Sequence, residues 1–469
     1  MLATIEGLWG IPDAVLEHVE QVRTATTLAA LVIAGLHLGL ALGAWVVQEE
    51  LSKRGRWLTD RPECPVCGRT LESKGLVPRT IHSVLGVLRW RRRVWRCPQR
   101  CPIGHIAPYD DELGLAAYQQ TSDELQQIAC EYAVFVPFRL SAHFVSRTFN
   151  IAVSSGSVWN WVQRAGTVAS SRVQQALDAL ADAEAPGDPE AASSTPDAGI
   201  CQLPLVIGGD GVMVPFRPQP GTPKGKTVWR EVKVGILARL GQRFTRTGEA
   251  VTIVLRRHLV AVLGDIDAFR DRLWLAAVHA GIHASPLVVW LSDGARGLWR
   301  VFAERLEGRA IGVLDFYHAA QHLWRVAKAV YDGRTAVAKG WFRATRHRLR
   351  VGQASMIITE LAALAHNAGL PASVQKTITQ VHAYLATHQH HLAYPLYEKL
   401  GIPRGSGMVE SACKWLIQQR FKGVGMRWSE DGFNHLLHLR LAWVNGEFDQ
   451  LFLTTDVGGS GDAAWSPNP

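Results

Sequence analysis

Three carboxylates in this sequence stand where buried elements end or begin. Asp210 follows the apolar run of LVIGGDGVMVP, Asp293 closes LVVWLSDG, and Glu410 opens a helix in GSGMVESACKWL. Short apolar runs bounded by glycine are typical of buried strands. A carboxylate at the open end of such a strand is partly desolvated but still accessible, and carboxylates arranged in this way can flank two divalent cations. The pattern predicts a two-metal phosphoryl-transfer site.

The charge of the chain indicates what this site would act on. The 469 residues include 50 Lys and Arg against 41 Asp and Glu, which gives a net charge of +9 and a pI near 9.3. The basic residues cluster in RWRRRVWR (89–96) and RATRHRLR (343–350). Such clusters are typical of nucleic-acid binders, and a merely soluble basic protein is the alternative. Together with a phosphoryl-transfer site, the clusters favour DNA as the substrate.

A fourth carboxylate competes with Asp293 for the second position in the site. Asp315 closes the apolar run of IGVLDFYH, and His318 follows it at the start of a helix. The order of the predicted strands favours Asp293 as the direct ligand. Asp315 and His318 would then lie beside the site or contact DNA, and Asp315 stays open as the alternative second aspartate.

Cations around Glu410 and on an upstream hairpin are suited to DNA phosphates rather than to metal. Trp428, in GMRWSEDG, would either stack on an unpaired end base or belong to the core. The predicted phosphate-binding residues are Lys414, Arg420, Lys422 and Arg427 near Glu410, and Arg91, Arg92 and Arg93 on the hairpin.

Four of the seven cysteines form two close pairs, Cys64 with Cys67 and Cys97 with Cys101. Zinc binds four thiolates as a tetrahedron, and two pairs held together by a hairpin supply that geometry. The sequence therefore predicts a closed, structural Zn²⁺ site. His105 is an alternative to Cys101, because the second spacing is slightly loose. Close cysteine pairs and the absence of a secretory signal favour a reducing cytosol.

Two histidine patterns are weaker candidates for metal binding. His318 and His322 have HxxxH spacing, but the glutamate expected after the first histidine is missing. His388, His390 and His391 lie in a polar stretch where a helix gives way to a loop. We expect this cluster to be solvated surface rather than a metal site.

A helix-turn-helix is predicted within FRLSAHFVSRTFNIAVSSGSVWNWVQRAG (138–166). Ser154 or Ser155 would cap the second helix, which is expected to end near Arg164 with Val158 and Trp161 facing inward. The second helix of such a motif enters the major groove of DNA, and a plain helical hairpin is the alternative. The predicted DNA contacts on this helix are Ser157, Asn160, Gln163 and Arg164.

The order of the remaining elements is typical of an RNase H-like fold. Strands are predicted in LVIGGDGVMVP, WREVKVGILARL and VTIVLRRH, then a helix, then strands in LVVWLSDG and AIGVLDFYH. The predicted fold class is therefore α/β, an RNase H-like catalytic core with a mixed five-stranded sheet flanked by helices. An all-helical insertion interrupts the core, and a zinc-ribbon hairpin and a helical DNA-binding region precede it.

Composition divides the chain further. The acidic run ADAEAPGDPEAASSTPDAG is rich in breakers and cannot build a core, so it is predicted to be a linker. The expected divisions are an N-terminal helical segment (1–58), a zinc-ribbon-like domain (59–108), a helical region with the helix-turn-helix (109–180), the linker (181–199), the first part of the catalytic core (200–322), a helical insertion (323–400), the closing catalytic helix region (401–450) and a disordered tail (451–469).

One apolar segment, TLAALVIAGLHLGLALGAWVV (27–47), is long enough to cross a bilayer. His37 sits near its middle, four small residues dilute it, and no second span follows. We expect a buried helix or a dimerisation helix, and membrane association is the disfavoured alternative. The small residues are Gly35, Gly39, Ala41 and Gly43.

The motifs GGDGVMVPFR, WREVKVG, SDGARGLW, VLDFYHAAQHLW, GSGMVESACKWL and GMRWSEDG, with CPVCG and RCPQRC upstream, resemble the ISKra family of bacterial insertion-sequence transposases. The resemblance covers about residues 60 to 450. It implies a DDE transposase with an RNase H-like core and metal-dependent cleavage and joining of transposon ends. The DDE roles then fall on Asp210, Asp293 and Glu410.

The sequence thus predicts a DNA transposase that binds terminal inverted repeats and uses Mg²⁺ or Mn²⁺ at the catalytic site. Its expected partners are transposon ends, target DNA and further copies of the chain, with neither a small-molecule substrate nor a membrane. The expected location is the cytoplasm, at the nucleoid. Two alternatives are an inactive or domesticated relative that only binds specific DNA, and a metal nuclease that hydrolyses without joining.

Overall fold

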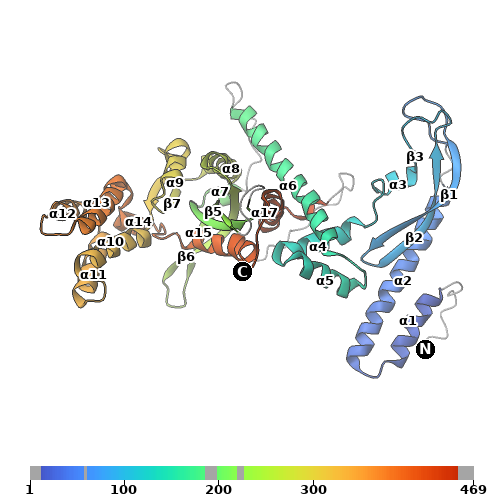
Figure 1. Cartoon of the computed structure of the whole chain (residues 1–469), viewed down its shortest axis with the longest axis horizontal. Coiled ribbons are helices and arrows are strands. Elements are labelled where there is room, and N and C mark those ends of the chain that lie inside the picture. Colours follow the sequence, from blue (N-terminus) through green and yellow to red (C-terminus); the bar gives the residue numbers. More distant parts are fainter. Residues whose placement is uncertain (1–11, 58–60, 185–197, 219–225, 453–469) are drawn as a thin grey trace. The chain divides into compact units, whose positions relative to one another are not determined.

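The computed structural model describes residues 12–57, 61–184, 198–218 and 226–452 (Figure 1). The described residues fall into two compact units, one within residues 12–165 with 449–452 and one within residues 166–448, and each is described separately below. Most of the predicted linker (181–199) and nearly all of the predicted disordered tail (451–469) lie outside the described residues.

Two helices open the first unit, α1 (Asp13–Thr24) and α2 (Leu28–Trp57). The carboxyl half of α2 packs against a β-hairpin core that contains Leu88 and Trp90. The amino half lies along α1 and leaves Val32, Ile33 and Leu36 exposed. Because α2 is apolar on all sides, one neighbouring helix and one hairpin cannot cover it.

Among the described residues, Leu28–Arg56 is the one helix long and apolar enough to cross a membrane, with a mean hydropathy of 2.1. Core helices and leader segments pass the same test of length and composition. Only 6% of its most apolar window is buried. The expectation of a helix buried within the chain is therefore wrong, whereas dimerisation stays a prediction.

A three-stranded antiparallel sheet follows, built from β1 (Glu72–Ser83), β2 (Gly86–Arg96) and β3 (His105–Ile106). Ser83 pairs with Gly86 at the turn, so the predicted hairpin is confirmed. Gly86 has a φ of 113°, which glycine adopts without the penalty of a Cβ. The short helix α3 (Pro108–Glu112) adds the buried ring of Tyr109 to the core beneath the hairpin.

Three further helices follow, α4 (Asp123–Phe135), α5 (Phe138–Phe149) and α6 (Ser155–Glu184), and α6 continues from the first unit into the second at Gly166. Asn150 ends α5 in a left-handed conformation, and the Ser154 hydroxyl accepts the Ser157 N–H at 2.9 Å to cap α6. Val158 and Trp161 are buried, as predicted. The helix runs on to Glu184 rather than ending near Arg164. Gly166 stays within the helix, at a position where a Cβ would lie 2.5 Å from His435.

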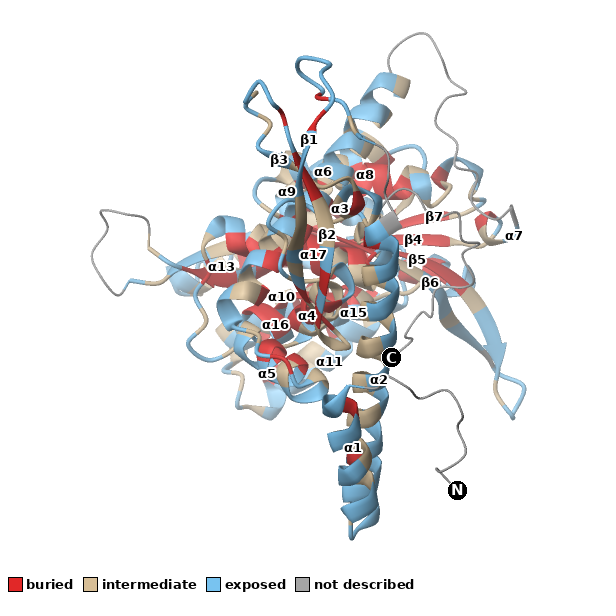
Figure 2. Cartoon of the chain, turned by 90° about the vertical axis from the view of Figure 1, so that its right-hand side faces the viewer, coloured by how far each residue is buried: buried red, intermediate tan, exposed pale blue. Residues whose placement is uncertain are grey.

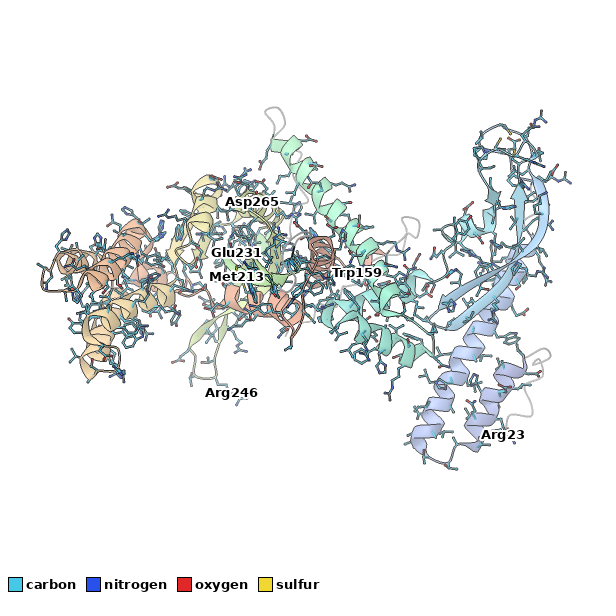
Figure 3. All side chains as sticks on the ribbon, in the orientation of Figure 1. Arg23, Trp159, Met213, Glu231, Arg246 and Asp265 are labelled. Carbon is cyan, nitrogen blue, oxygen red and sulfur yellow. The ribbon has the colours of Figure 1, made fainter. Side chains whose placement is uncertain are left out.

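The second unit is built on a mixed five-stranded sheet, which confirms that prediction. Its order is β6-β5-β4-β7-β8. Within this sheet, β4 pairs antiparallel with β5 and β5 pairs antiparallel with β6, while β7 is parallel to β4 and β8 is parallel to β7. The strands are β4 (Leu205–Phe216), β5 (Val228–Phe244), β6 (Ala250–Leu263), β7 (Val288–Ser292) and β8 (Ile311–Leu314). Figure 2 shows the central strands largely buried, whereas Figure 3 shows Arg246 on the projecting β5–β6 hairpin.

Alternate residues of the central strands face two different layers. Ile207 and Trp290 pack into a core with α8 (Ile266–His279) and α9 (Arg296–Val301). Val206 and Leu291 pack into the other core, with the helices that follow β8. The period of two along each strand places every residue on one face or the other.

The second face also receives α15 (Gly407–Ala412). A Cβ on Gly208 would lie 2.5 Å from the side chain of Val409, so glycine is needed where α15 crosses β4. Residues 316–399 are all-helical apart from their connections. The elements there are α10 (Phe316–Tyr331), α11 (Ala336–Arg350), α12 (Ala354–Ala365), α13 (Ala372–Thr387), η3 (Gln389–His391) and α14 (Tyr394–Lys399).

The remaining elements of the second unit are short, apart from one long helix near its end. That helix, α17, supplies Phe433, Leu436 and Leu437 to the core. These elements are α7 (Ala198–Cys201), η1 (Ile282–Ala284), η2 (Phe302–Leu306), η4 (Cys413–Gln418), α16 (Gln419–Phe421) and α17 (Glu430–Val444). In the first unit, η5 spans Asp449–Leu451.

Candidate active site and cysteine cluster

The registers of three parallel strands bring three aspartates to one end of the sheet. Gly209 of β4 is opposite Ser292 of β7, and Ser292 is opposite Leu314 of β8. Asp210, Asp293 and Asp315 are the next residues of these three strands. Because residues in register on parallel strands face the same side, all three start from the face that α15 and α10 cover.

The two glycines before Asp210 suggested that the strand ends there and that Asp210 lies beyond it. In the structure, Asp210 lies inside β4. The strand continues to Phe216 because it pairs with β5 along its whole length. The pairing with β7 stops at Gly209, however, so Asp210 is the first residue of β4 past that neighbour. The aspartate is thus anchored in a strand and half-buried, and it still borders the end of the shorter β7.

The surroundings of Asp210 oppose its negative charge. Burial raises the pKa of this carboxyl group, the Gly211 N–H lowers it through a 2.7 Å hydrogen bond, and the charge of Asp293 raises it again. His318 and the Cys413 thiol, 3.8 Å from Oδ2, lower it, but the net pKa shift is upward. A desolvated carboxyl beside a second acid is typical of a functional site and of a site for a cation.

Asp293 is held by its backbone and leaves much of its carboxylate available. Its main-chain carbonyl accepts the Trp299 indole N–H at 2.7 Å, and its Oδ1 accepts the Ala295 N–H at 3.0 Å. Among the described residues, no donor reaches its Oδ2. The side chain is half-buried.

Asp315, in contrast, is 1% exposed and both of its oxygens are engaged. Oδ1 accepts the His318 N–H at 2.7 Å and caps α10, while Oδ2 accepts the Ser406 N–H of the loop before α15. Burial alone would raise the pKa of Asp315, but the hydrogen bonds from His318 and Ser406 outweigh it and lower the pKa to about 2. Asp315 therefore ties α10 to the 404–406 loop.

The His318 ring lies among these acids. Its Nδ1 is 3.2 Å from Oδ1 of Asp315. Asp315 raises the pKa of His318, burial opposes this, and the charges of Asp293 and Asp210 raise it further. Protonated His318 thus pairs with Asp315 and lies within electrostatic range of Asp293 and Asp210.

Glu410 reaches the site from α15, and its carboxylate is exposed. Its Oε2 is 3.9 Å from the Lys414 ammonium group, a surface ion pair. Cys413 on the same helical stretch contacts Asp210, so this stretch passes directly over that aspartate. The carboxylates of Asp210, Asp293 and Glu410 form an oxygen-only donor set, which suits Mg²⁺ or Mn²⁺. Among the described residues, these three do not bring their ligand oxygens within 4.8 Å of one another.

The cations predicted near Glu410 differ in accessibility. Lys414, Lys422 and Arg427 are exposed. Arg420 is 2% exposed, with its guanidinium 5.3 Å from the centre of the Trp428 ring. Trp428 itself is buried and donates its indole N–H to the Phe421 carbonyl at 2.9 Å, which places it in the core rather than on a DNA-binding face.

The histidine cluster after α13 is not the solvated surface that we expected. His388 is 6% exposed, and its ring centre lies 4.8 Å from that of Trp299, while His391 lies 4.2 Å from the same ring. Burial lowers the pKa of His388 to about 4. The helices after β8 fold back over α9, so two of the three histidines belong to an aromatic cluster and only His390 is exposed.

In the first unit, four thiols come together. The Sγ atoms of Cys64, Cys67, Cys97 and Cys101 all lie within 4.8 Å of one another, the one such group of metal-binding side chains among the described residues. Cys67 and Cys97 are 3.6 Å apart, close to the sulfur separation of about 3.8 Å that follows from Zn–S bonds of ~2.3 Å in a tetrahedron. The cluster includes Cys101 and not His105, and it is able to bind zinc.

The backbone around the cysteines prepares this geometry. The Cys64 carbonyl accepts the Gly68 N–H at 2.8 Å, and the Cys97 carbonyl accepts the Arg100 N–H at 3.0 Å. Gly68 and Arg100 both have positive φ, which closes the two tight turns. Each turn carries its pair of thiols toward the other, as in a zinc ribbon.

The predicted DNA contacts of the first unit have different surroundings. Arg91 is exposed, whereas Arg92 is 12% exposed and pairs with Asp110 at 3.0 Å. Arg93 donates to the Ser73 hydroxyl at 3.0 Å. The structure thus leaves Arg91 as the accessible member of the three, because the hairpin uses Arg92 to hold α3.

On α6, Asn160 and Arg164 are exposed, while Ser157 and Gln163 are half-buried. The Ser157 hydroxyl lies 2.9 Å from that of Ser154, and Arg164 donates to Gln126 of α4 at 3.0 Å. Trp159 (Figure 3) packs edge-to-face on Phe138, 5.3 Å between ring centres, and so fixes the angle of α6 to α5. Asn160 and Arg164 are thus the exposed members of the four predicted contacts, and Arg164 is hydrogen-bonded to α4.

Two residues beside the candidate site were not selected from the sequence. Cys413 follows Glu410 by three positions on a helix, and this spacing signals that the two share a face. Ser406 acts through its backbone, so its residue type carries no signal. Glu231 of β5 is also acidic and is opposite Met213 of β4 (Figure 3). It lies on the face of the sheet away from Asp210, however, and pairs with Lys233.

Comparisons with solved structures give distant structural likenesses. Neither the protein-family models nor the curated proteins contain a match to this sequence. A solved structure described as the Drosophila P element transposase strand transfer complex aligns with 72% of this chain and 95% of its own, at 12% identity and a TM-score of 0.34. We base the function below on the geometry of this chain's own residues.

Proposed function

We propose that this chain is a DNA transposase of the DDE class that cleaves the ends of its element and joins them to target DNA. The observation that carries the proposal is the register that sets Asp210 beside Asp293, on the face that α15 crosses. The strand order β6-β5-β4-β7-β8, with three antiparallel strands before two parallel ones, supports an RNase H-like core. DDE transposases, which the motifs resemble, use such a core.

Asp210, Asp293 and Glu410 would hold the divalent cations. When bound, Mg²⁺ or Mn²⁺ would activate the attacking oxygen and stabilise the leaving one. Glu410 would turn from Lys414 toward Asp210, and Lys414 would then be free to bind a DNA phosphate. In the first reaction a water oxygen bonds to phosphorus and the 3′-oxygen leaves. In the second, that 3′-hydroxyl attacks a target phosphodiester, so one P–O bond forms for each that breaks.

Asp293 remains the better second aspartate. Its Oδ2 is available, whereas both oxygens of Asp315 are committed to α10 and to Ser406. A metal at Asp315 would have to displace two backbone N–H donors. Asp315 would instead position His318, whose positive charge lies near Asp293 and Asp210.

Recognition of the terminal inverted repeats would rest on the first unit. A zinc ion held by the four cysteines would fix the hairpin that carries Arg91, and α6 would present Asn160 to a DNA groove. In the second unit, Lys414, Lys422 and Arg427 are exposed for phosphates near the cleaved bond. A homo-oligomer at the nucleoid would hold two ends together.

An assay of reaction products tests the proposal. A labelled duplex that contains the DNA flanking this protein's own gene is incubated with the purified chain and Mg²⁺. The proposal predicts cleavage at the element end and joined products, and predicts that Asp210→Asn abolishes both. Cleavage without joining would indicate the metal nuclease. Specific binding without cleavage in Mg²⁺ or Mn²⁺ would indicate the inactive, DNA-binding relative.

A further inference from the structure

A groove between α10 and α11 opens beside Asp315 and is not part of the carboxylate site. It consists of two adjoining hollows, of about 420 and 320 Å³, which share Tyr317, Arg343 and Arg346. Volumes of this size are within the range of sites that bind small organic groups. Phe316 and Tyr317, the two residues that follow Asp315, line the groove, so its occupant would lie close to Asp315.

The α11 side of the groove carries a row of cations. Lys339, Arg343 and Arg346 are exposed and follow one another at spacings of four and three, which places them on one side of the helix. Among the described residues, no acid forms an ion pair with any of the three. The Arg346 guanidinium lies 5.6 Å from the centre of the Phe316 ring, which orients it without neutralising it.

Another arginine of the same helix is used differently. Arg348 donates to both oxygens of Glu360, at 2.8 and 2.6 Å. Arg350 and Arg404, at the end of the groove, share Glu398 at 3.3 and 3.4 Å. The fold thus pairs the arginines around the groove and leaves Arg343 and Arg346 as uncompensated positive charge within it.

The α10 side of the groove supplies an aromatic ring. Tyr317 is 58% exposed, although it is flanked by the buried Phe316. A Cβ on Gly405 would lie 2.6 Å from the Tyr317 ring, so the backbone before α15 packs directly against one side of it. The ring is therefore held in place while more than half of the side chain remains open.

We propose that this groove binds an unpaired stretch of one DNA strand next to the cleaved phosphodiester. Arg343 and Arg346 would bind its phosphates, and Tyr317 would stack on a base. From Lys339 to Arg346 the helix rises about 10 Å at ~1.5 Å per residue, so the three cations are spread widely enough to contact more than one phosphate of a strand. An exposed ring favours an unpaired base, because base pairs in a duplex are covered by their neighbours. That the strand is DNA rests on the function proposed above.

Fluorescence anisotropy tests the groove without any need for cleavage. The full chain is titrated, in metal-free buffer, with a labelled single-stranded oligonucleotide and with the duplex of the same sequence. We expect Arg343→Ala combined with Arg346→Ala to weaken single-strand binding about tenfold, and Tyr317→Ala to do the same. Tyr317→Phe keeps the ring and should bind like wild type.

Arg348→Ala is the matched control, since it removes one positive charge from the same helix outside the groove. It should change single-strand binding by about twofold at most. Equal losses from Arg346→Ala and Arg348→Ala would overturn the proposal, as would an equal loss of duplex binding in the groove variants. Normal element cleavage with unchanged single-strand binding in those variants would leave the transposase intact and refute the groove. If the groove variants lose single-strand binding but the wild-type chain never cleaves the element end, the groove would stand and the transposase would be refuted.

Discussion

The Cys413 thiol lies 3.8 Å from Oδ2 of Asp210, on the face of the sheet that α15 crosses. Burial raises the pKa of Asp210, and the thiol is among the groups that oppose this rise. Cys413 thus favours the charged form of Asp210, because a hydrogen-bond donor to a carboxylate stabilises its ionised state.

Replacement of Cys413 should shift the acid limb of the pH–rate profile. Asp210 has to be ionised to bind a cation, so Cys413→Ala, which removes a weak donor, should raise the pKa of Asp210 and move the limb up by about half a pH unit. Cys413→Ser keeps a donor and should shift it less. Cys201→Ala removes another buried thiol and serves as the control. A limb that moves to lower pH would contradict this account.

Asp315 should matter for stability more than for chemistry. Asp315→Ala removes the cap of α10 and leaves the buried Ser406 N–H without its acceptor, so the free energy of unfolding should fall by about 2–4 kcal/mol. Urea unfolding followed by tryptophan fluorescence measures this change. Asp182→Ala removes an exposed carboxylate and should have little effect. Equal effects of the two substitutions would contradict the anchoring role of Asp315.

The ion pair between Asp315 and His318 should make the stability depend on pH in both directions. The folded pKa of Asp315, about 2, is below its ordinary value of 3.8, so its contribution is present above pH 3.8 and is lost as the pH falls toward 2. The pKa of His318 is raised above 6.5, so its contribution is present below pH 6.5 and is lost as the pH rises through the folded value. The stability difference between wild type and Asp315→Asn should therefore be greatest between about pH 4 and 6.5. A difference that grows toward pH 8 would contradict the ion pair.

The cysteine cluster should hold one zinc ion per chain. Elemental analysis of the purified protein should find it, and Cys97→Ser should lose it. His105→Ala should retain the metal, because His105 lies outside the cluster. Removal by a strong chelator should loosen the hairpin and weaken binding of the element end. Retention of zinc in Cys97→Ser with loss in His105→Ala would show that the ligand set is wrong.

The exposed half of α2 should mediate association of the proposed homo-oligomer. Gly35 and Gly39 have open space beside them, and small residues four apart allow close helix packing. Light scattering in detergent-free buffer should detect an oligomer, and Gly39→Ile should weaken it. Gly340→Ile, also next to open space but on α11, is the control. Flotation with lipid vesicles and no self-association would favour the membrane alternative.

Much of the architecture follows from local pattern. Runs such as VVWLS and IGVL between breakers are short and apolar enough to be buried strands, and the hairpin at Gly86 follows from alternation and a turn residue. The extent of β4 does not follow, because Gly208 and Gly209 suggest an end. In the fold, these glycines instead allow Val409, Trp290 and Leu298 to approach the strand.

The candidate site was accessible from sequence only in part. The apolar runs locate Asp210, Asp293 and Asp315, but strand register decides that they are neighbours, and register is set by tertiary pairing. Side-chain partners were equally hidden, since nothing local shows that Arg92 pairs with Asp110 or that Trp299 buries His388. Long-range packing determines which charged residues stay accessible.

The most direct test compares Asp293→Asn with Asp315→Asn in the element-end cleavage assay. Both variants keep the size of the side chain, and Asp315→Asn keeps an oxygen that can cap α10. We predict that Asp293→Asn abolishes cleavage in Mg²⁺ and in Mn²⁺, while Asp315→Asn cleaves at a reduced rate and is less stable. Full cleavage by Asp293→Asn, with none by a folded Asp315→Asn, would contradict the assignment of the site.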